Sequence, residues 1–511
     1  MTDWTAGYVA DIGYTYGYYP ELNPLRVKLA FLNSGLVAPE VGVACELGFG
    51  QGMSVNLHAA ASIVQWAGTD FNPSQAAFAQ ELATVSQANA LLLDEGFAEF
   101  CTRQDLPEFD YIGLHGIWSW VSDENRAIIV DFVRRKLKVG GVLYISYNTQ
   151  PGWAAMVPMR HLLTEHAEVM AAPGRGIVSR VDAALDFAER LLATNPMYAR
   201  ANLQVAERVQ KMKEQNRNYL AHEYFNRDWH PMPFAEMAEW LAPAKLNYAC
   251  SAHYLSHVDT VNLTVEQQTF LKDIPDSMFR ETVRDFMVNQ QFRKDYWVKG
   301  ARRLSGLDRS EAIRKQKVIL IAPRGEIVPK TTGVLGEATM SEAIYGPILD
   351  ALSDHQPKSL YQIEQAVKSN RIAIHQILEA VILLTDMGVV AAVQDDEAIT
   401  KSKIQTDKLN LHLMRKARGG NELNYLASPV TGGGIPVNRF QQLFLLSATQ
   451  GNAKPEEWAE FVLQLLAVQG QKILKDGRTL STAEENLAEL TEQAKDFAEK
   501  RMPIIKALKI I

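Results

Sequence analysis

The sequence predicts an α/β protein: a doubly wound parallel sheet near the N-terminus, followed by mostly helical modules. From Val41 to Asn148 short apolar runs alternate with longer amphipathic ones, which is the pattern of a parallel sheet flanked by helices. The chain has 511 residues, which at about 150 residues per domain corresponds to roughly three domains. Hydrophobic residues make up 47% and charged residues 22%, so the chain has an ordinary globular composition.

Five apolar runs are predicted strands: Val43 to Glu46, Val64 to Thr69, Ala90 to Leu93, Tyr111 to Leu114 and Val142 to Ser146. Amphipathic runs between them predict helices over Ser54 to Ile63, Gln75 to Ala88 and Asn125 to Lys138. The last helix is expected to stop at Val139-Gly140-Gly141, a helix-terminating signal. This order of elements is Rossmann-like.

Three further regions follow the first domain, residues 1–155. Residues 156–215 are mostly helix-forming and predict a helical connector. Residues 216–320 form a mixed segment, with helices expected over Phe234 to Leu241 and Asp276 to Asn289. Residues 321–511 form a C-terminal domain whose first part resembles a winged helix. Its expected elements are helices 344–352, 360–368 and 373–387 with strand 389–393, followed by helices 456–469 and 483–499.

Composition excludes several function classes. Lys and Arg total 52 against 59 Asp and Glu, a net charge of −7, which disfavours a protein dominated by nucleic-acid binding. The longest apolar run, 372–393, contains Glu379 and Asp386, so we expect no membrane span. The start, Met1-Thr2-Asp3-Trp4, lacks a secretory signal, which makes the cytoplasm the expected compartment. The 3 cysteines are far apart, so neither a disulfide framework nor a metal site is expected.

The segment from Cys45 to Ser54 carries the main motif, at the turn from the first strand into the first helix. Its glycines, Gly48, Gly50 and Gly52, let the backbone approach a ligand at a helix N-terminus. A dinucleotide fingerprint needs glycine where this chain has Met53, which disfavours nicotinamide or flavin binding. The motif, with an acid at Glu46, resembles that of the class I S-adenosylmethionine-dependent methyltransferases.

That resemblance implies S-adenosylmethionine as the cofactor and a methyltransferase fold for the first domain. Glu46 would hold the ammonium group of the cofactor, directly or through water, although it could also be a structural acid. The backbone around Gly50, Gln51 and Gly52 suits the carboxylate of the cofactor. Asp70 follows Gly52 by 18 residues, close to the spacing of about 20 at which an acid accepts the ribose hydroxyls.

The ends of the next strands complete the expected cofactor site. Phe71 is expected against the adenine face, although a position in the core remains open. Asp94 or Glu95 is expected near the adenine amino group, although either acid could instead be a solvated loop residue. Leu114 ends the fourth strand beside the methyl donor. A tyrosine-rich segment ahead of the first strand, with Tyr8, Tyr14, Tyr16, Tyr18 and Tyr19, suggests a lid or a cover of the sheet edge.

Candidate catalytic residues follow the fourth and fifth strands. Methyl transfer mainly requires positioning, and an amine acceptor must in addition lose a proton. An aromatic wall at Trp118 could hold a cation by cation–π attraction, whereas Trp120 fits a core position better. The candidates by position are His115, Trp118, Tyr147 and Asn148, together with Tyr18 in the tyrosine-rich segment.

A narrower resemblance covers residues 8–305. Residues 19–26, 109–120 and 146–153 are similar to methyltransferases that carry a methyltransferase regulatory domain. Residues 218–225 resemble the opening of that domain, and 284–286 with 292–295 its close. The best-known relatives are rickettsial protein-lysine methyltransferases that modify outer-membrane proteins, so the resemblance implies methylation of lysine in a protein acceptor.

Two other functions remain open at this stage. The acceptor could be a small molecule or a glycan precursor, in which case we expect a deep closed pocket rather than an open groove. The chain could also be a cofactor-sensing DNA-binding regulator, but helix 373–387 carries Glu379 and Asp386 and only His375 as a basic group, which is poor for phosphate contact. The sequence leaves homodimerisation undetermined and identifies no general base.

Overall fold

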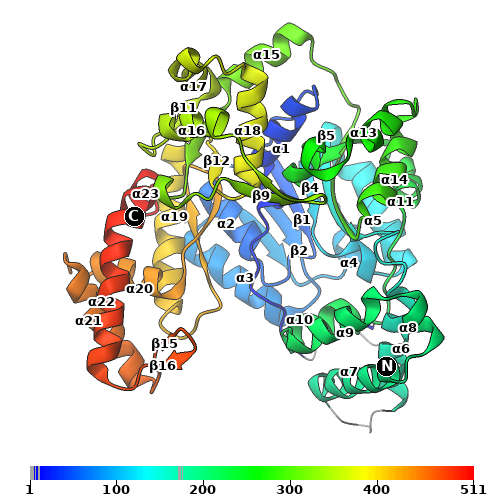
Figure 1. Cartoon of the computed structure of the whole chain (residues 1–511), viewed down its shortest axis with the longest axis horizontal. Coiled ribbons are helices and arrows are strands. Elements are labelled where there is room, and N and C mark those ends of the chain that lie inside the picture. Colours follow the sequence, from blue (N-terminus) through cyan, green and yellow to red (C-terminus); the bar gives the residue numbers. More distant parts are fainter. Residues whose placement is uncertain (1–4, 6, 10–11, 171–173, 175) are drawn as a thin grey trace.

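The centre of the computed structural model, which describes residues 5, 7–9, 12–170, 174 and 176–511, is a seven-stranded sheet (Figure 1). The strand order is β3-β2-β1-β4-β5-β7-β6. The first five strands pair in parallel, and β7 is antiparallel to both β5 and β6. Their bounds are β1 Val43–Leu47, β2 Gln65–Thr69, β3 Ala90–Leu93, β4 Phe109–Leu114, β5 Leu137–Asn148, β6 Leu246–Ser251 and β7 Phe292–Lys299. The predicted doubly wound sheet is therefore confirmed; Met1 to Trp4 lie outside the described residues.

Helices cover both faces of the sheet. One face packs against α1, α2 and α18, and the other against α4, α5 and α11. Side chains cap two of these helices. Asn23 accepts a hydrogen bond from the backbone N–H of Leu25 at the start of α1, and Asn72 accepts one from the backbone N–H of Ser74 at the start of α3. The bounds are α1 Pro24–Asn33, α2 Met53–Ala61, α3 Pro73–Ser86, α4 Phe97–Phe100, α5 Asp123–Lys136, α11 Phe234–Leu241 and α18 Ile374–Asp386.

Two features of the sheet differ from the sequence prediction. Helix α5 ends at Lys136, and β5 begins immediately at Leu137, so Gly140 and Gly141 lie within the strand rather than ending the helix. The register between β4 and β5 shifts between Phe109 and Tyr111, which accommodates the longer strand. In addition, β6 and β7 come from the segment predicted as a separate domain over 216–320, so that segment completes the sheet of the first domain.

The helical connector forms a lobe with its own core. Trp153, Leu163, Leu185 and Leu220 are among the buried residues that hold it together. Figure 1 shows this lobe at the lower right, where α7, α9 and α10 pack side by side. Its helices are α6 Val157–Val169, α7 Ile177–Ala193, α8 Met197–Ala201, α9 Gln204–Glu214 and α10 Arg217–Tyr224, and the short helices of the next segment are α12 Asp259–Asn262, α13 Val265–Lys272 and α14 Ser277–Val288.

The expected winged-helix elements are present, but they lie in a different setting. The three-stranded sheet β11-β8-β12 takes its central strand, β8, from ahead of the first helix. Helix α18, the proposed recognition helix, is buried in the main core at residues 377, 378 and 380–385. It is therefore not free to enter a DNA groove. The bounds are α15 Gly306–Lys315, β8 Lys317–Leu320, β9 Lys330–Gly333, β10 Gly336–Thr339, α16 Glu342–Ala351, β11 Lys358–Ser359, α17 Leu360–Ala366 and β12 Val390–Ala392.

The last part of the chain packs on the first domain. Helix α19 lies against α2 and α3, and a second core joins α2 residues such as Leu57 to the C-terminal helices. Within the described residues, no helix is both long enough and apolar enough to span a bilayer. The bounds are α19 Asp396–Lys416, β13 Tyr425–Ser428, β14 Gly433–Pro436, α20 Arg439–Thr449, α21 Pro455–Val468, β15 Leu474–Lys475, β16 Arg478–Thr479, α22 Ala483–Asp496 and α23 Met502–Ala507.

Candidate functional site

The glycine motif forms a tight loop between β1 and α2. Gly48, Gly50 and Gly52 have φ values of 71°, 57° and 70°, in the left-handed region that favours glycine. A Cβ on Gly48 would lie 2.4 Å from the Cδ1 of Ile117, and one on Gly52 would lie 2.4 Å from the Cβ of Ala79. Side chains at these two positions would therefore displace the loop from its neighbours.

A cavity of about 240 Å³ lies at the carboxyl ends of β1, β2, β3 and β4. This edge is where open α/β sheets bind ligands. The residues that line the cavity include eight that the sequence predicts for the site, namely Glu46, Gly48, Gly50, Gln51, Asp70, Phe71, Glu95 and His115. Four adjacent strand ends thus bring together residues up to 69 positions apart in the chain.

Asp70 links the end of β2 to the glycine loop. Its Oδ2 accepts a hydrogen bond of 2.9 Å from the Gly50 amide, and its Oδ1 accepts one of 3.0 Å from the Asn72 amide. Burial raises the pKa of this carboxyl to about 6, although both amides favour the charged form. Each oxygen keeps a further lone pair, so Asp70 can still accept from the hydroxyls of a ribose.

Glu46 lies in the wall of the cavity with a carboxylate oxygen left unpaired. Its side chain is buried, and Oε2 has no hydrogen-bond partner among the described residues. Burial first, and the charge of Asp70 second, raise its pKa to about 8. A buried unpaired carboxylate is costly, so this position favours a cationic or N–H-bearing ligand group.

Tyrosines from the N-terminal segment cover the cavity. Tyr8 meets the Phe71 ring edge-on at 5.6 Å, and Tyr19 stacks on His115 at 3.8 Å between ring centroids. Tyr8, Tyr14 and Tyr19 all line the cavity. Tyr16 instead contacts Phe78 on α3, so the tyrosine-rich segment spans both the cavity and the outside of the domain.

Several predicted catalytic residues lie elsewhere. Trp118 is fully buried in the core beneath the sheet, where its indole nitrogen donates to the sulfur of Met232, whereas Trp120 lines the cavity. The predicted positions of the two tryptophans are therefore reversed. The short 3-10 turn Trp118–Trp120 points alternate side chains in different directions, which a sequence pattern does not reveal.

Tyr147, Asn148 and Tyr18 are also outside the cavity lining. The Tyr147 hydroxyl donates to Asp295 of β7 at 3.0 Å, and Asn148 is buried, with its backbone N–H donating to the Ser119 hydroxyl. The Tyr18 hydroxyl lies 3.2 Å from His58 Nε2, and its ring packs on Tyr425 of the C-terminal domain. Strand β7 pairs with β5 beside Tyr147 and Asn148, and the C-terminal domain contacts Tyr18.

Three predicted cofactor residues do not reach the cavity. Gly52 is the N-cap of α2, Leu114 is buried in the core, and Asp94 is exposed. Of the two acids after β3, Glu95 lines the cavity and pairs with Arg103 at 2.6 Å. The cavity also contains Phe97, Asn125 and Asp228, which no motif in the sequence singled out.

His115, the remaining catalytic candidate, is held in the cavity wall. Its Nδ1 lies 2.7 Å from the Tyr144 hydroxyl, and burial lowers its pKa to about 3. The ring is therefore neutral at physiological pH. Among the described residues no group of three or more His, Cys, Asp or Glu side chains could hold a metal ion.

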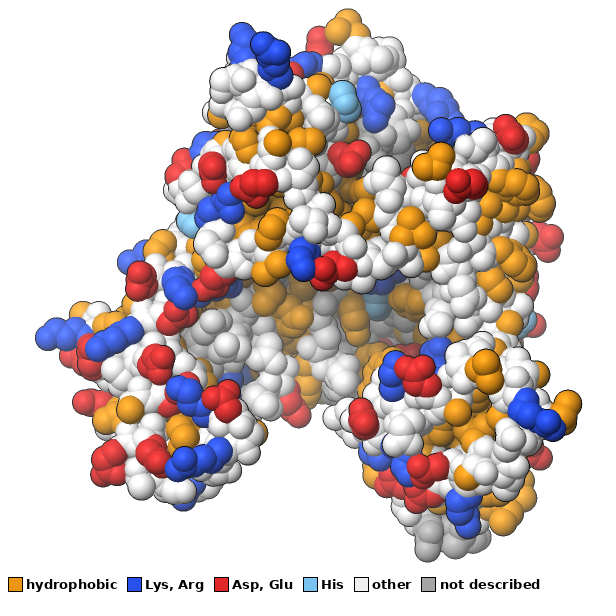
Figure 2. All heavy atoms as spheres, in the orientation of Figure 1, with side chains coloured by type: hydrophobic (Ala, Val, Ile, Leu, Met, Phe, Trp, Pro, Cys, Tyr) orange, Lys and Arg blue, Asp and Glu red, His pale blue; other side chains and the backbone are white. Residues whose placement is uncertain are grey.

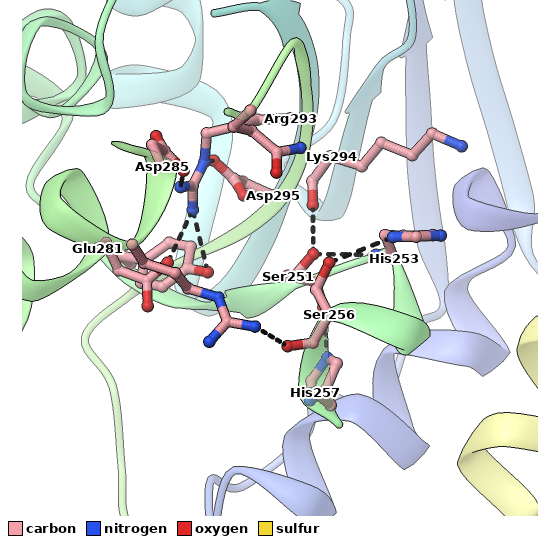
Figure 3. Close-up of polar contacts among 12 residues, drawn as sticks. Ser251, His253, Ser256, His257, Glu281, Asp285, Arg293, Lys294 and Asp295 are labelled. Atoms are coloured by element: carbon pink, nitrogen blue, oxygen red, sulfur yellow. Dashed lines mark hydrogen bonds and ion pairs between the residues drawn. The ribbon is translucent and has the colours of Figure 1, made fainter. Parts of the chain in front are cut away.

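A second cavity, of about 390 Å³, lies between β6, η4 (Tyr254–His257), α13 and α14. Figure 3 shows Arg293 in its wall among three carboxylates, at 3.0 Å from Glu281, 2.6 Å from Asp285 and 2.8 Å from Asp295. Because Arg293, Asp285 and Asp295 are buried and paired, the cluster ties α14 to β7.

Comparisons with known proteins agree with this geometry. A family model described as a predicted methyltransferase regulatory domain matches residues 216–299. A protein of Synechocystis is 40% identical over 512 residues, covering 99% of both chains. The chain belongs to the S-adenosylmethionine-dependent methyltransferases with a methyltransferase regulatory domain. A Rickettsia prowazekii protein is 25% identical to this methyltransferase over 295 residues, 55% of this chain and 51% of that protein.

A solved structure shares the fold of this methyltransferase over nearly its whole length. PKMT2 from Rickettsia typhi, in complex with AdoHcy, aligns with a TM-score of 0.68 at 16% identity and covers 94% of this chain and 97% of its own. The likeness extends beyond the catalytic sheet to the C-terminal domain, so the arrangement of regions is common to both proteins. The methyltransferase cavity described above fits the cofactor of the family, because it offers an unpaired carboxylate, a glycine loop and an acid at the end of β2.

Proposed function

We propose that this methyltransferase transfers a methyl group from S-adenosylmethionine to lysine side chains of a protein acceptor. The observation that carries the proposal is the aromatic part of the cavity lining, which includes Tyr14, Tyr19, His115 and Trp120. These groups are aromatic and uncharged, so they suit an amine nucleophile, which reacts only as the neutral base. The resemblance to rickettsial protein-lysine methyltransferases supports the same acceptor.

The residues of this chain would divide the binding of the cofactor among them. The Glu46 carboxylate would hold the ammonium group, the amides of the glycine loop the carboxylate, and Asp70 the ribose hydroxyls. When bound, the cofactor supplies a methyl group already activated on a sulfonium. The task left to the chain is to exclude water and align the acceptor, which the tyrosine cover and His115 are placed to do.

An open approach supports a macromolecular acceptor. Figure 2 shows a deep hollow between the C-terminal helices and the lobe of α6 to α10. Helix α10, at the edge of that lobe, contacts the tyrosine cover through His222, whose ring lies 5.1 Å from that of Tyr14. A chain lying in this hollow would therefore pass close to the cavity.

The test is to incubate the purified protein with methyl-labelled S-adenosylmethionine and a cell lysate, and then to separate protein from small molecules. We expect label in the protein fraction that is stable to base and that hydrolysis releases as methyllysine. Asp70→Ala should abolish labelling, whereas Asp131→Ala, at an exposed ion pair on α5, should not. Label only in small molecules would replace the protein acceptor with a small molecule or glycan precursor.

A further inference from the structure

The second cavity, between β6, η4, α13 and α14, carries an excess of acid around one buried arginine. The carboxylates of Glu281, Asp285 and Asp295 surround the single guanidinium of Arg293, so three negative charges meet one positive charge. Each nitrogen of Arg293 already donates a hydrogen bond: Nε to Asp295 and Nη1 to Asp285. Its Nη2 donates to Glu281 and to the Tyr248 hydroxyl. The arginine is therefore committed to these partners.

One carboxylate oxygen of this cluster has no partner. The Asp285 side chain lines the cavity, and the residue is only 2% exposed. Its Oδ1 lies 2.6 Å from Arg293 Nη1, but its Oδ2 accepts no hydrogen bond from the described residues. A buried carboxylate oxygen without a donor costs free energy. The position therefore favours a ligand that brings a positively charged N–H donor.

The other arginines and Lys294 of the cavity wall have partners of their own. The Lys294 ammonium pairs with Glu21 at 2.6 Å, and Figure 3 shows its side chain extending away from the three carboxylates. Arg284 pairs with Asp259 at 2.5 Å. Arg280 donates to a main-chain carbonyl at 3.1 Å. None of these cations supplies the donor that Asp285 Oδ2 lacks.

The histidines of the wall are also engaged elsewhere. The ring nitrogens of His257 lie 3.1 Å from the Asn33 amide nitrogen and 2.8 Å from the Ser251 carbonyl. His253 lies 3.6 Å from Asp386 of α18. Among the described residues no group of three or more His, Cys, Asp or Glu side chains could hold a metal ion, which favours an organic cation over a metal.

We propose that this second cavity binds a small molecule with an ammonium or guanidinium group, which donates to Asp285 Oδ2 and neutralises the excess negative charge of the cluster. The cavity volume, about 390 Å³, is within the range of about 300–1,000 Å³ that is usual for small-ligand sites. Polar side chains in the rest of the lining, among them Ser251, Gln268 and Gln290, can hold the remainder of such a ligand. The site does not depend on the identity of the methyl acceptor.

The second cavity lies beside the cofactor cavity. Phe292 lines the second cavity and His115 lines the first, and their rings meet edge-on with 6.2 Å between centroids. The cofactor cavity holds an unpaired carboxylate of its own, that of Glu46. An amine could therefore enter either cavity. Saturation of the protein with S-adenosylhomocysteine fills the cofactor cavity, so that probe binding reports on the second one.

The titration of Asp285 gives the second site a signature in its pH dependence. Burial raises the pKa of this carboxyl to about 7, although the charge of Arg293 opposes the shift. A bound cation favours the charged carboxylate, so below pH 7 binding must release a proton. The affinity should therefore fall about tenfold from pH 8 to pH 6. An amine with a pKa of about 10.4 stays charged over this range.

Calorimetry on the full chain, saturated with S-adenosylhomocysteine, tests the proposal with cadaverine and agmatine as probes. We expect both to bind the wild type, and 1-pentanol, which has no charge, not to bind. Asp285→Asn should weaken binding at least about tenfold and remove the pH dependence. Glu281→Gln, which removes a more exposed charge of the same cluster, should weaken binding about threefold or more. Glu266→Gln, on α13 but outside the cavity lining, is the matched control and should bind like the wild type.

The fold of each variant is checked by urea unfolding and by its affinity for S-adenosylhomocysteine. If Asp285→Asn does not fold, Glu281→Gln decides the outcome, because its side chain is 23% exposed. Absence of binding of both probes to the wild type would overturn the proposal. So would equal affinity in the wild type and the folded cluster variants. Probe binding that S-adenosylhomocysteine abolishes would place the probe in the cofactor cavity and would also overturn it.

Discussion

The Glu46 carboxyl shows how a binding residue can lower stability. Its pKa is raised to about 8 against 4.5, so between these values the folded chain holds a proton that the unfolded chain has lost. The free energy of unfolding therefore falls as the pH rises through this range. We expect Glu46→Gln to unfold at the wild-type temperature at pH 4, at a higher temperature at pH 9, and to bind S-adenosylmethionine more weakly. A thermal shift that is equal at both pH values would contradict this interpretation; Glu207→Gln serves as the control.

Substitutions of the two tryptophans after β4 should have different effects, one on stability and the other on cofactor binding or methyl transfer. Trp118 is fully buried, so Trp118→Ala should lower the free energy of unfolding by about 3–5 kcal/mol. Trp120 lines the cavity and is 6% exposed, so Trp120→Phe should leave a folded protein with weaker cofactor binding or slower transfer. Urea unfolding and calorimetry measure the two effects. Equal loss of stability in Trp120→Phe and Trp118→Ala would place both indoles in the core.

More of the residues predicted to bind the cofactor line the cavity than of those predicted to be catalytic. Glu46 is the last but one residue of β1, and Gly48 and Asp70 directly follow β1 and β2, so the strand direction fixes the edge of the sheet at which they lie. Tyr147 and Asn148 also end a strand, but β7 pairs with that strand and covers it. The sequence around residues 147–148 does not indicate that β7, more than 140 residues further along the chain, pairs with this strand.

At the scale of elements, β7 is held by its charges as well as by its hydrogen bonds. Arg293 is buried between Glu281, Asp285 and Asp295, so its loss would leave carboxylates without a cation. We expect Arg293→Met to lower the free energy of unfolding by about 3–5 kcal/mol. Arg134→Met, at a half-exposed ion pair on α5, should change it by less than about 0.5 kcal/mol. Urea titration checks both, and similar small effects would show that β7 does not depend on the cluster.

The elements themselves were predictable where periodicity was continuous. The five parallel strands and helices α2, α3 and α5 follow from alternating apolar runs, whereas the four-residue helix α4 was not predicted. Strand β6 has only 6 residues with an irregular burial pattern, and β7 carries Arg293, Lys294 and Asp295 in its centre. A run of charged residues in the sequence indicates a loop as long as the ion pairs of those residues are unknown. The antiparallel edge of the sheet could therefore not be predicted.

For the whole molecule, the cavity is an assembly of distant segments. Its lining combines tyrosines of the N-terminal segment with residues at four strand ends. The C-terminal domain supports this assembly from behind the glycine loop: Asn23 donates to the Thr431 carbonyl at 3.2 Å, and Tyr18 contacts both His58 and Tyr425. The C-terminal domain is therefore a part of the structural frame of the site.

These contacts predict that residues 1–393 do not function without the rest of the C-terminal domain. In the full chain, α2 buries Met53, Leu57, Ala60 and Ala61 in the core shared with the C-terminal domain. Removal of residues 394–511 would expose that face directly behind the glycine loop, and an exposed apolar helix face favours aggregation. We expect residues 1–393 to aggregate by light scattering and to bind S-adenosylmethionine at least tenfold more weakly. The full chain with Lys416→Met, which loses the ion pair with Glu81 and the cation–π contact with Phe78 but keeps the shared core, should remain monodisperse and bind normally. A monodisperse 1–393 fragment with wild-type affinity would show that the C-terminal domain is not needed to hold the cofactor site.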